Sequence, residues 1–238
     1  SLYLLGMRAR SVFITGTNTG AGKTILTALL LHHLRETGVE ALAMKPVCTG
    51  PRDDVRLLQS LQPGEVRMDL MNPFYYKTPA TPAVAARRSG RKVEVKALKA
   101  AVSLAEKECG QLLVEGAGGV LVPLNERGQT WADFLKATKM PVLVAARNEL
   151  GVLNHTLLTV KYLQSIGAEV LGVCLQNPIN GASMAPSQRT NFEVLRDYLS
   201  KIPVFSIPFL GEDAGKTGVI KQGQKKIKKT LAEILELV

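Results

Sequence analysis

Short apolar runs alternate along the chain with longer segments in which apolar residues recur with the period of an α-helix. The short runs are typical of strands buried on both faces of a parallel sheet, and the longer segments are typical of helices that cover such a sheet. This order predicts an α/β fold with a single doubly wound, mostly parallel sheet flanked by helices. The predicted strands are Ser11–Thr15, Ala41–Met44, Gln111–Val114, Pro141–Ala145, Glu169–Leu175 and Val204–Ile207.

The clearest helical period follows Lys23, where Leu26, Leu30 and Leu34 lie on one apolar stripe and Gly38 ends the helix. By contrast, the segment 72–82 is rich in proline and tyrosine, and it is predicted to be an ordered but irregular connection. Further helices are predicted at Asp53–Leu61, Val95–Glu108, Trp131–Ala137, Val152–Ile166, Gln188–Leu199 and Lys226–Leu237.

Composition places the chain among ordinary globular proteins. Of its 238 residues, 46% are hydrophobic and 21% are charged. No shift in composition marks a second domain, so residues 11–238 are predicted to form one domain. Residues 1–10 are interpreted as an N-terminal extension, with Met7 as the natural start. Neither end carries a long apolar run, and the scattered Cys48, Cys109 and Cys174 have neither disulfide nor zinc spacing. We therefore expect a cytoplasmic protein.

The formal net charge of +10 is partly local. Lys221, Lys225, Lys226, Lys228 and Lys229 crowd into the C-terminal segment, beside apolar residues of helical period. A block of this kind is most often the solvated face of an amphipathic helix. We therefore expect neither nucleic acid nor a membrane as a partner.

The strongest chemical signal is the run GTNTGAGKT from Gly16 to Thr24, which follows a predicted strand and opens a predicted helix. This is the context of a phosphate-binding loop, whose backbone N–H groups and helix start favour anions. The Lys23 ammonium can reach the terminal phosphates, and the Thr24 hydroxyl suits magnesium. The first glycine lies one residue further from Gly22 than in the common pattern, so the loop is a variant.

Acidic side chains that could help to hold magnesium stand where predicted strands end. Glu115 closes an apolar run, and Asp54 begins a helix with Asp53 beside it as a competitor. Lys45 ends the second predicted strand and is followed by proline, a hydroxyl residue and glycine. Because ligands of such folds bind at the carboxyl ends of the strands, these groups are expected near the phosphate-binding loop.

Taken together, these segments resemble the dethiobiotin synthetase family. Residues 16–24 match the family pattern G-T-x-T-x-x-G-K-T, and residues 45–50 match K-P-V-x-[ST]-G. Residues 114–119 match V-E-G-A-G-G, and residues 150–159 match L-G-x-[IL]-N-H-x-x-L-T. The spacing agrees from Gly16 to about Leu210, so the resemblance covers most of the chain.

The resemblance implies an ATP-dependent, magnesium-requiring cyclo-ligase of biotin biosynthesis. Such an enzyme carboxylates diaminopelargonic acid with carbon dioxide or bicarbonate and closes the ureido ring, with hydrolysis of ATP to ADP and phosphate. It also implies a homodimer whose substrate site lies at the subunit interface, against the helix start of the partner.

Carried over residue by residue, the resemblance implies Lys45 and Lys23 as catalytic residues, and Thr24, Asp54 and Glu115 as magnesium ligands. The substrate is expected at Thr19, Lys45, Thr49, Gly118, Gly151 and Asn154. ATP and its metal are expected at Gly20, Ala21, Gly22, Lys23, Thr24, Ile25, Asp54, Glu115, Gly116, Ala117, Gly118, Gln176, Asn177, Pro208, Phe209 and Leu210.

Two departures from the family pattern leave the nucleotide specificity undecided. Gly20 stands where the family usually has an acidic or polar residue. Gln176 stands where an asparagine ends the base-recognition strand, and Asn177 follows one residue late. Nucleoside triphosphates other than ATP therefore remain alternatives.

Other classes of P-loop protein fit less well. Partition ATPases of this fold carry an additional lysine early in the loop, where this chain has Thr17, Asn18 and Thr19. Cobyrinate-type amidating ligases need a glutaminase domain, for which the sequence offers no evident cysteine–histidine set.

Overall fold

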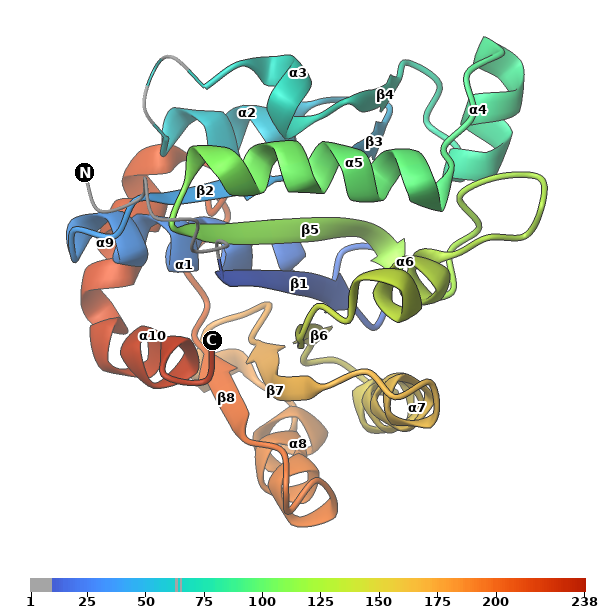
Figure 1. Cartoon of the computed structure of the whole chain (residues 1–238). Coiled ribbons are helices and arrows are strands. Elements are labelled where there is room, and N and C mark those ends of the chain that lie inside the picture. Colours follow the sequence, from blue (N-terminus) through green and yellow to red (C-terminus); the bar gives the residue numbers. More distant parts are fainter. Residues whose placement is uncertain (1–9, 63, 65) are drawn as a thin grey trace.

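The computed structural model describes residues 10–62, 64 and 66–238. The predicted N-terminal extension therefore lies, apart from Arg10, outside the described residues. A parallel six-stranded sheet with the order β2-β5-β1-β6-β7-β8 forms the centre, which confirms the predicted fold class (Figure 1). Its strands are β1 (Arg10–Gly16), β2 (Ala41–Met44), β5 (Gln111–Gly119), β6 (Val142–Arg147), β7 (Val170–Gln176) and β8 (Val204–Ile207).

The sheet is buried on both faces because successive side chains of a strand point to opposite sides. In β1, Val12 and Ile14 enter one hydrophobic core, and Phe13 enters the other. The Val12 side is covered by α1 (Lys23–Glu36), α2 (Asp53–Ser60), α9 (Thr217–Lys226) and α10 (Lys228–Leu235). The Phe13 side is covered by α5 (Val95–Ala105), α6 (Trp131–Thr138), α7 (Val152–Ser165) and α8 (Pro186–Tyr198).

The proline-rich connection contains elements that the sequence analysis missed. Residues 72–82 include β4 (Phe74–Tyr76), which pairs in parallel with β3 (Val47–Thr49) in a separate two-stranded sheet. Strands this short show too little alternation to be recognised by pattern. The short helices α3 (Met68–Met71) and α4 (Pro82–Ser89), and the 3-10 turns η2 (Glu106–Glu108) and η3 (Gly181–Ser183), complete the described elements.

The C-terminal segment was also predicted wrongly in part. The helix predicted at Lys226–Leu237 corresponds to α10, but α9, which precedes it and ends at Lys226, was not predicted. The lysines are therefore divided between two helices, both of which pack against α1. Their apolar faces contribute Ile220, Leu231 and Ile234 to the core, as expected for amphipathic helices.

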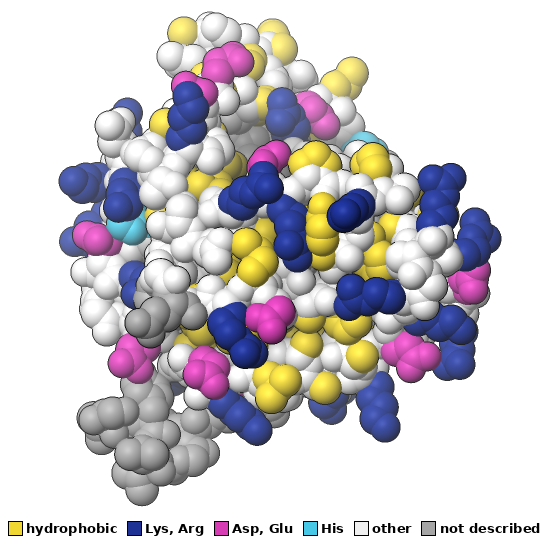
Figure 2. Space-filling model, turned by 90° about the horizontal axis from the view of Figure 1, so that it is seen from above, with side chains coloured by type: hydrophobic (Ala, Val, Ile, Leu, Met, Phe, Trp, Pro, Cys, Tyr) yellow, Lys and Arg dark blue, Asp and Glu magenta, His cyan; other side chains and the backbone are white. Residues whose placement is uncertain are grey.

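Basic side chains do not form one continuous patch on the face seen in Figure 2, where Lys and Arg residues are spread among acidic and hydrophobic ones. A dispersed arrangement is typical of a solvated surface rather than of a track for a polyanion. Within the described part of the chain, none of the helices has the length and apolar character needed to cross a membrane.

The contact between α1 and the C-terminal helices contains His32 and His33, both buried. The His33 Nδ1 lies 3.0 Å from the Gln224 Nε2. Burial lowers the pKa of both histidines from about 6.5, and nearby lysines lower it further, with Glu36 opposing the shift at His32. The folded state therefore favours neutral imidazoles.

We expect this contact to weaken in acid. Because the folded-state pKa of each histidine is below its unfolded value of about 6.5, the stability that they contribute is present above that pH and is lost as the pH falls below it. Thermal unfolding should be compared at pH 7.5 and 5.5 for the wild type and the double variant His32→Gln, His33→Gln. The melting temperature of the wild type should fall further on acidification than that of the double variant. Equal losses would show that these histidines do not control the pH response.

Candidate active site

The phosphate-binding loop lies at the carboxyl edge of the sheet, between β1 and α1. Gly20 and Gly22 have φ values of +77° and +86°, a region that residues with a Cβ rarely adopt. A Cβ at position 22 would also lie 2.6 Å from the Gln176 Cγ. The loop borders a cleft of about 700 Å³. The predicted residues that line this cleft are Thr19, Gly20, Gly22, Lys23, Thr24, Ile25, Lys45, Thr49, Asp54, Glu115, Ala117 and Gly118.

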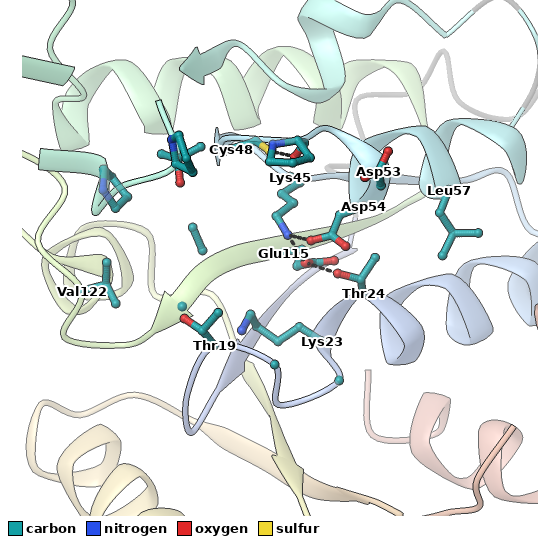
Figure 3. Close-up of a pocket in the computed structure, with 18 of the residues that line it drawn as sticks. Thr19, Lys23, Thr24, Lys45, Cys48, Asp53, Asp54, Leu57, Glu115 and Val122 are labelled. Atoms are coloured by element: carbon teal, nitrogen blue, oxygen red, sulfur yellow. Dashed lines mark hydrogen bonds and ion pairs between the residues drawn. The ribbon is translucent and has the colours of Figure 1, made fainter. Parts of the chain in front are cut away.

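A charged cluster occupies one wall of the cleft (Figure 3). The Lys45 ammonium contacts Asp54 and lies 2.8 Å from Glu115 Oε1. The Thr24 hydroxyl donates to the same Glu115 oxygen at 2.8 Å. Burial disfavours the charge on Lys45, but Glu115 and Asp54 outweigh burial and raise its pKa above the usual value. Lys45 therefore stays positively charged at neutral pH.

Lys23 extends into the cleft from the phosphate-binding loop, and Lys45 extends into it from the opposite side (Figure 3). Its Nζ donates to the Asn18 carbonyl at 3.1 Å, inside the loop. Burial lowers the pKa of Lys23 to about 8, Glu115 opposes that change, and Lys45 adds to it. A phosphate placed in the loop would restore the favourable surroundings that this buried ammonium otherwise lacks.

The donor set suits magnesium, which prefers oxygen ligands and keeps several waters or phosphate oxygens. Glu115 is fully buried, and its Oε2 has no hydrogen-bonding partner among the described residues. An unpaired buried carboxylate oxygen is costly unless a cation or donor approaches it. Thr24 and Asp54 lie beside it, whereas Asp53 pairs with Arg56 at 3.0 Å. Asp54, and not Asp53, is therefore the aspartate that belongs to the charged cluster.

A second cleft, of about 460 Å³, adjoins the first. It is lined by Gly20, Gly22 and Ile25, which also line the first cleft, and by the predicted base-site residues Gln176, Asn177, Pro208, Phe209 and Leu210. The Asn177 amide is engaged with other side chains: its Oδ1 accepts from Asn148 at 2.8 Å, and its Nδ2 donates to Ser206 at 3.1 Å. The Gln176 Nε2 is buried and has no partner among the described residues. Of the two, only Gln176 has a donor that is unpaired.

Four of the predicted residues do not line either cleft. Ala21 is buried within the loop, and Gly116 lies against Phe13, whose ring would be 2.7 Å from a Cβ at position 116. The requirement for glycine at position 116 is thus explained by packing. Gly151 and Asn154 lie at the exposed start of α7, outside both clefts of this chain.

Several residues that line the clefts were not predicted from the sequence. Residues 79–82, Val122 and Cys48 also line the first cleft, and the Cys48 thiol lies 3.4 Å from the Pro51 carbonyl. Arg147, at the end of β6, lines both clefts. Its position two residues beyond the predicted strand Pro141–Ala145 was the one sequence signal for a site residue.

Known structures that resemble this chain confirm the fold. The cell division ATPase MinD of Pyrococcus furiosus has a TM-score of 0.59 with 19% sequence identity, and covers 96% of this chain and 98% of its own. The septum site-determining protein MinD of Pyrococcus horikoshii, complexed with Mg-ADP, has a TM-score of 0.60 with 18% identity. The match covers 95% of this chain and 94% of that protein. Similarity at this level of identity shows the fold alone.

Sequence comparisons are more specific. The family described as an AAA domain matches residues 10–212. An ATP-dependent dethiobiotin synthetase BioD of an Anaeromyxobacter species is 41% identical over 70% of this chain and 76% of its own length. The protein of the same name from Bacillus licheniformis is 34% identical over 88% of this chain and 90% of its own length. With the charged cluster and the phosphate-binding loop in place, these relatives show that the chain belongs to the ATP-dependent dethiobiotin synthetase family.

Proposed function

We propose that this chain carboxylates diaminopelargonic acid and closes the product into the ureido ring of dethiobiotin, with ATP hydrolysed to ADP and phosphate. The single observation that best supports this function is the meeting of Lys23, Lys45 and the Thr24–Asp54–Glu115 cluster at one cleft. A P-loop alone would support any nucleotide hydrolase. A second buried lysine on the opposite wall supports a reaction in which a further anion meets the terminal phosphate.

The reaction has three bond-forming stages. One amine of the substrate attacks carbon dioxide and loses a proton, which gives a carbamate. A carbamate oxygen then attacks the terminal phosphorus of ATP, and ADP leaves. Finally, the second amine attacks the activated carbonyl carbon, loses a proton and expels phosphate as the ring closes. The substrate itself accepts the phosphoryl group, so no side-chain nucleophile is needed.

The residues of the cleft would act by positioning and by charge. The carbamate would lie between Thr19 of the loop and Thr49 of β3, within reach of the Lys45 ammonium. Lys23 would hold the terminal phosphate, and the loop backbone would hold the rest of the triphosphate. Negative charge grows on oxygen at each stage, so two fixed ammonium groups in a partly buried cleft favour the transition states over the ground state.

Magnesium would be held by Thr24, Asp54 and Glu115, together with phosphate oxygens and water. When bound, it neutralises part of the charge on the β- and γ-phosphates. No three His, Cys, Asp or Glu side chains in the described part of the chain form a metal-binding group on their own. Metal binding is therefore expected to depend strongly on the nucleotide.

We further propose a homodimer in which the substrate carboxylate binds the start of the partner's α7, near Gly151 and Asn154. This helix start is exposed, and α7 runs over 14 residues, so its N-terminal N–H groups favour an anion. Leu150 and Leu158 beside it are 89% and 60% exposed, as expected for side chains that a second subunit covers. We place the reaction in the cytoplasm, where ATP is available.

Nucleotide choice is expected to be relaxed. Gln176 replaces the asparagine expected at the base site, its amide Nε2 is unpaired, and Asn177 is held by Asn148 and Ser206. Because the glutamine side chain is longer than that of asparagine and has one more rotatable bond, its amide can hydrogen-bond to bases in more than one geometry and discriminates less between them. Initial rates with ATP, GTP and CTP at equal concentration should fall within about tenfold of one another, which corresponds to roughly 1.4 kcal/mol. Strict use of ATP would show that Gln176 or another group selects adenine.

The proposed function is tested by omission. Phosphate release should be followed with ATP and magnesium, and then with diaminopelargonic acid and bicarbonate added singly and together. Release should rise strongly only when both are present, because the carbamate is the phosphoryl acceptor. A rate that is the same with and without the diamine would show a simple ATPase and would refute the ligase assignment.

A further inference from the structure

Arg147 lies where the phosphate cleft and the base cleft meet. Its side chain borders both clefts, as do Gly20, Gly22 and Ile25 of the phosphate-binding loop and α1. Its neighbour in register on the adjacent strand is Gln176, which borders the base cleft. A nucleotide that extends from the loop to the base cleft would therefore pass beside Arg147.

The backbone at Arg147 is held firmly. The next residue, Asn148, is buried, and its backbone N–H donates to the Gln176 carbonyl at 2.8 Å. The Asn148 amide accepts from Asn191 at 2.8 Å and donates to Asn177 at 2.8 Å, and the Gln188 amide donates to the Asn148 carbonyl at 2.8 Å. These bonds join the ends of β6 and β7 to α8. The network therefore fixes the backbone position of Arg147.

The Arg147 guanidinium itself is held only weakly. Its Nε lies 3.3 Å from Glu149 Oε2, and the two side chains are 49% and 55% exposed. Exposed ion pairs of this kind contribute little, so the guanidinium can exchange Glu149 for a stronger anion at small cost. The other lysine or arginine side chains that border the two clefts in the described structure are Lys23 and Lys45, which contact the loop carbonyl and the carboxylates.

We infer that Arg147 is a nucleotide-binding residue whose guanidinium donates hydrogen bonds to phosphate oxygens of the bound nucleotide. The planar fork of arginine suits phosphate, and a preorganised backbone reduces the entropy lost on binding. In this position it would hold the polyphosphate between the loop and the base cleft. The inference rests on the proposed function only in taking the two clefts as the nucleotide site.

The test is equilibrium binding of Mg-ADP and of adenosine, without the diamine, to the wild type and three variants. Arg147→Gln should weaken Mg-ADP binding about tenfold or more and leave adenosine binding unchanged, because adenosine has no phosphate. Arg147→Lys should keep part of the affinity. The matched control Glu149→Gln removes the acid partner and should bind Mg-ADP at least as tightly as the wild type.

The inference is overturned if Arg147→Gln binds Mg-ADP like the wild type. It is also overturned if adenosine and Mg-ADP lose affinity equally, since that result would indicate a disturbed base cleft rather than a lost phosphate contact. Circular dichroism of each variant controls for folding. Because no ligase turnover is measured, a failure of the proposed reaction would leave this outcome unaffected, and the two claims can fail separately.

Discussion

Replacing Lys23 by alanine should reduce the rate of dethiobiotin formation by at least about a hundredfold, and should weaken ATP binding as well. Lys23 is the lysine of the phosphate-binding loop, and its buried ammonium borders the cleft. Removing it takes away a charge that both the bound nucleotide and the transition state need. Fold stability should be preserved, because burial already disfavours the charged form of this side chain.

The pH dependence of nucleotide binding gives a second readout for Lys23. Because its pKa is lowered to about 8, the free protein loses this proton at mildly alkaline pH, and nucleotide binding must then restore it. ATP affinity should therefore decline as the pH rises past about 8 in the wild type. The decline should be absent in Lys23→Ala. Lys136→Ala, at an exposed position on α6, serves as the matched control and should behave like the wild type. Full ligase activity in folded Lys23→Ala would contradict the assignment of the loop.

Lys45→Gln should affect chemistry much more than binding. The Lys45 ammonium lies on the wall opposite the loop, so it stabilises charge on the carbamate and on the phosphoryl group in transfer rather than the resting nucleotide. A preorganised charge contact of this kind contributes roughly 3 kcal/mol, or about two orders of magnitude in rate. Single-turnover product formation should fall by that factor, while equilibrium ATP binding should change little.

The control for Lys45 is Lys77→Gln, an exposed lysine just after β4. Its single-turnover rate should equal that of the wild type. Folding of Lys45→Gln needs a separate check, since the substitution leaves Asp54 and the buried Glu115 without their shared cation. If the folded variant forms product at the wild-type rate, Lys45 is an ordinary strand-end lysine and has no catalytic role.

Much of the fold could be predicted because buried parallel strands and one-sided helices leave clear periods in the sequence. The short β3 and β4 escaped detection because three residues carry no readable alternation. Helix α9 was missed for a different reason. Only Val219 and Ile220 among its ten residues carry apolar side chains, so it has no clear apolar period.

The candidate site, like the fold, could be predicted from the sequence only in part. Lys23, Thr24 and Glu115 could be placed because strand ends of a doubly wound sheet converge at one edge. The residue types alone could not decide between Asp53 and Asp54, because two adjacent acids at a helix start look alike. The family resemblance selected Asp54, and Asp54 is the one that contacts Lys45, whereas Asp53 pairs with Arg56. Arg147 was not recognised as a site residue, although it lies just beyond a strand end, because an arginine two positions before a glutamate is typical of a solvent-exposed ion pair.

The central claim, that the chain forms the ureido ring from a carbamate, is tested most directly with isotope-labelled bicarbonate. The protein should be incubated with diaminopelargonic acid, ATP, magnesium and carbon-13 bicarbonate, and the product analysed by mass spectrometry. We predict dethiobiotin that carries the label at its ring carbonyl, formed in equal amounts with ADP and phosphate. ADP and phosphate released without labelled dethiobiotin would contradict the account.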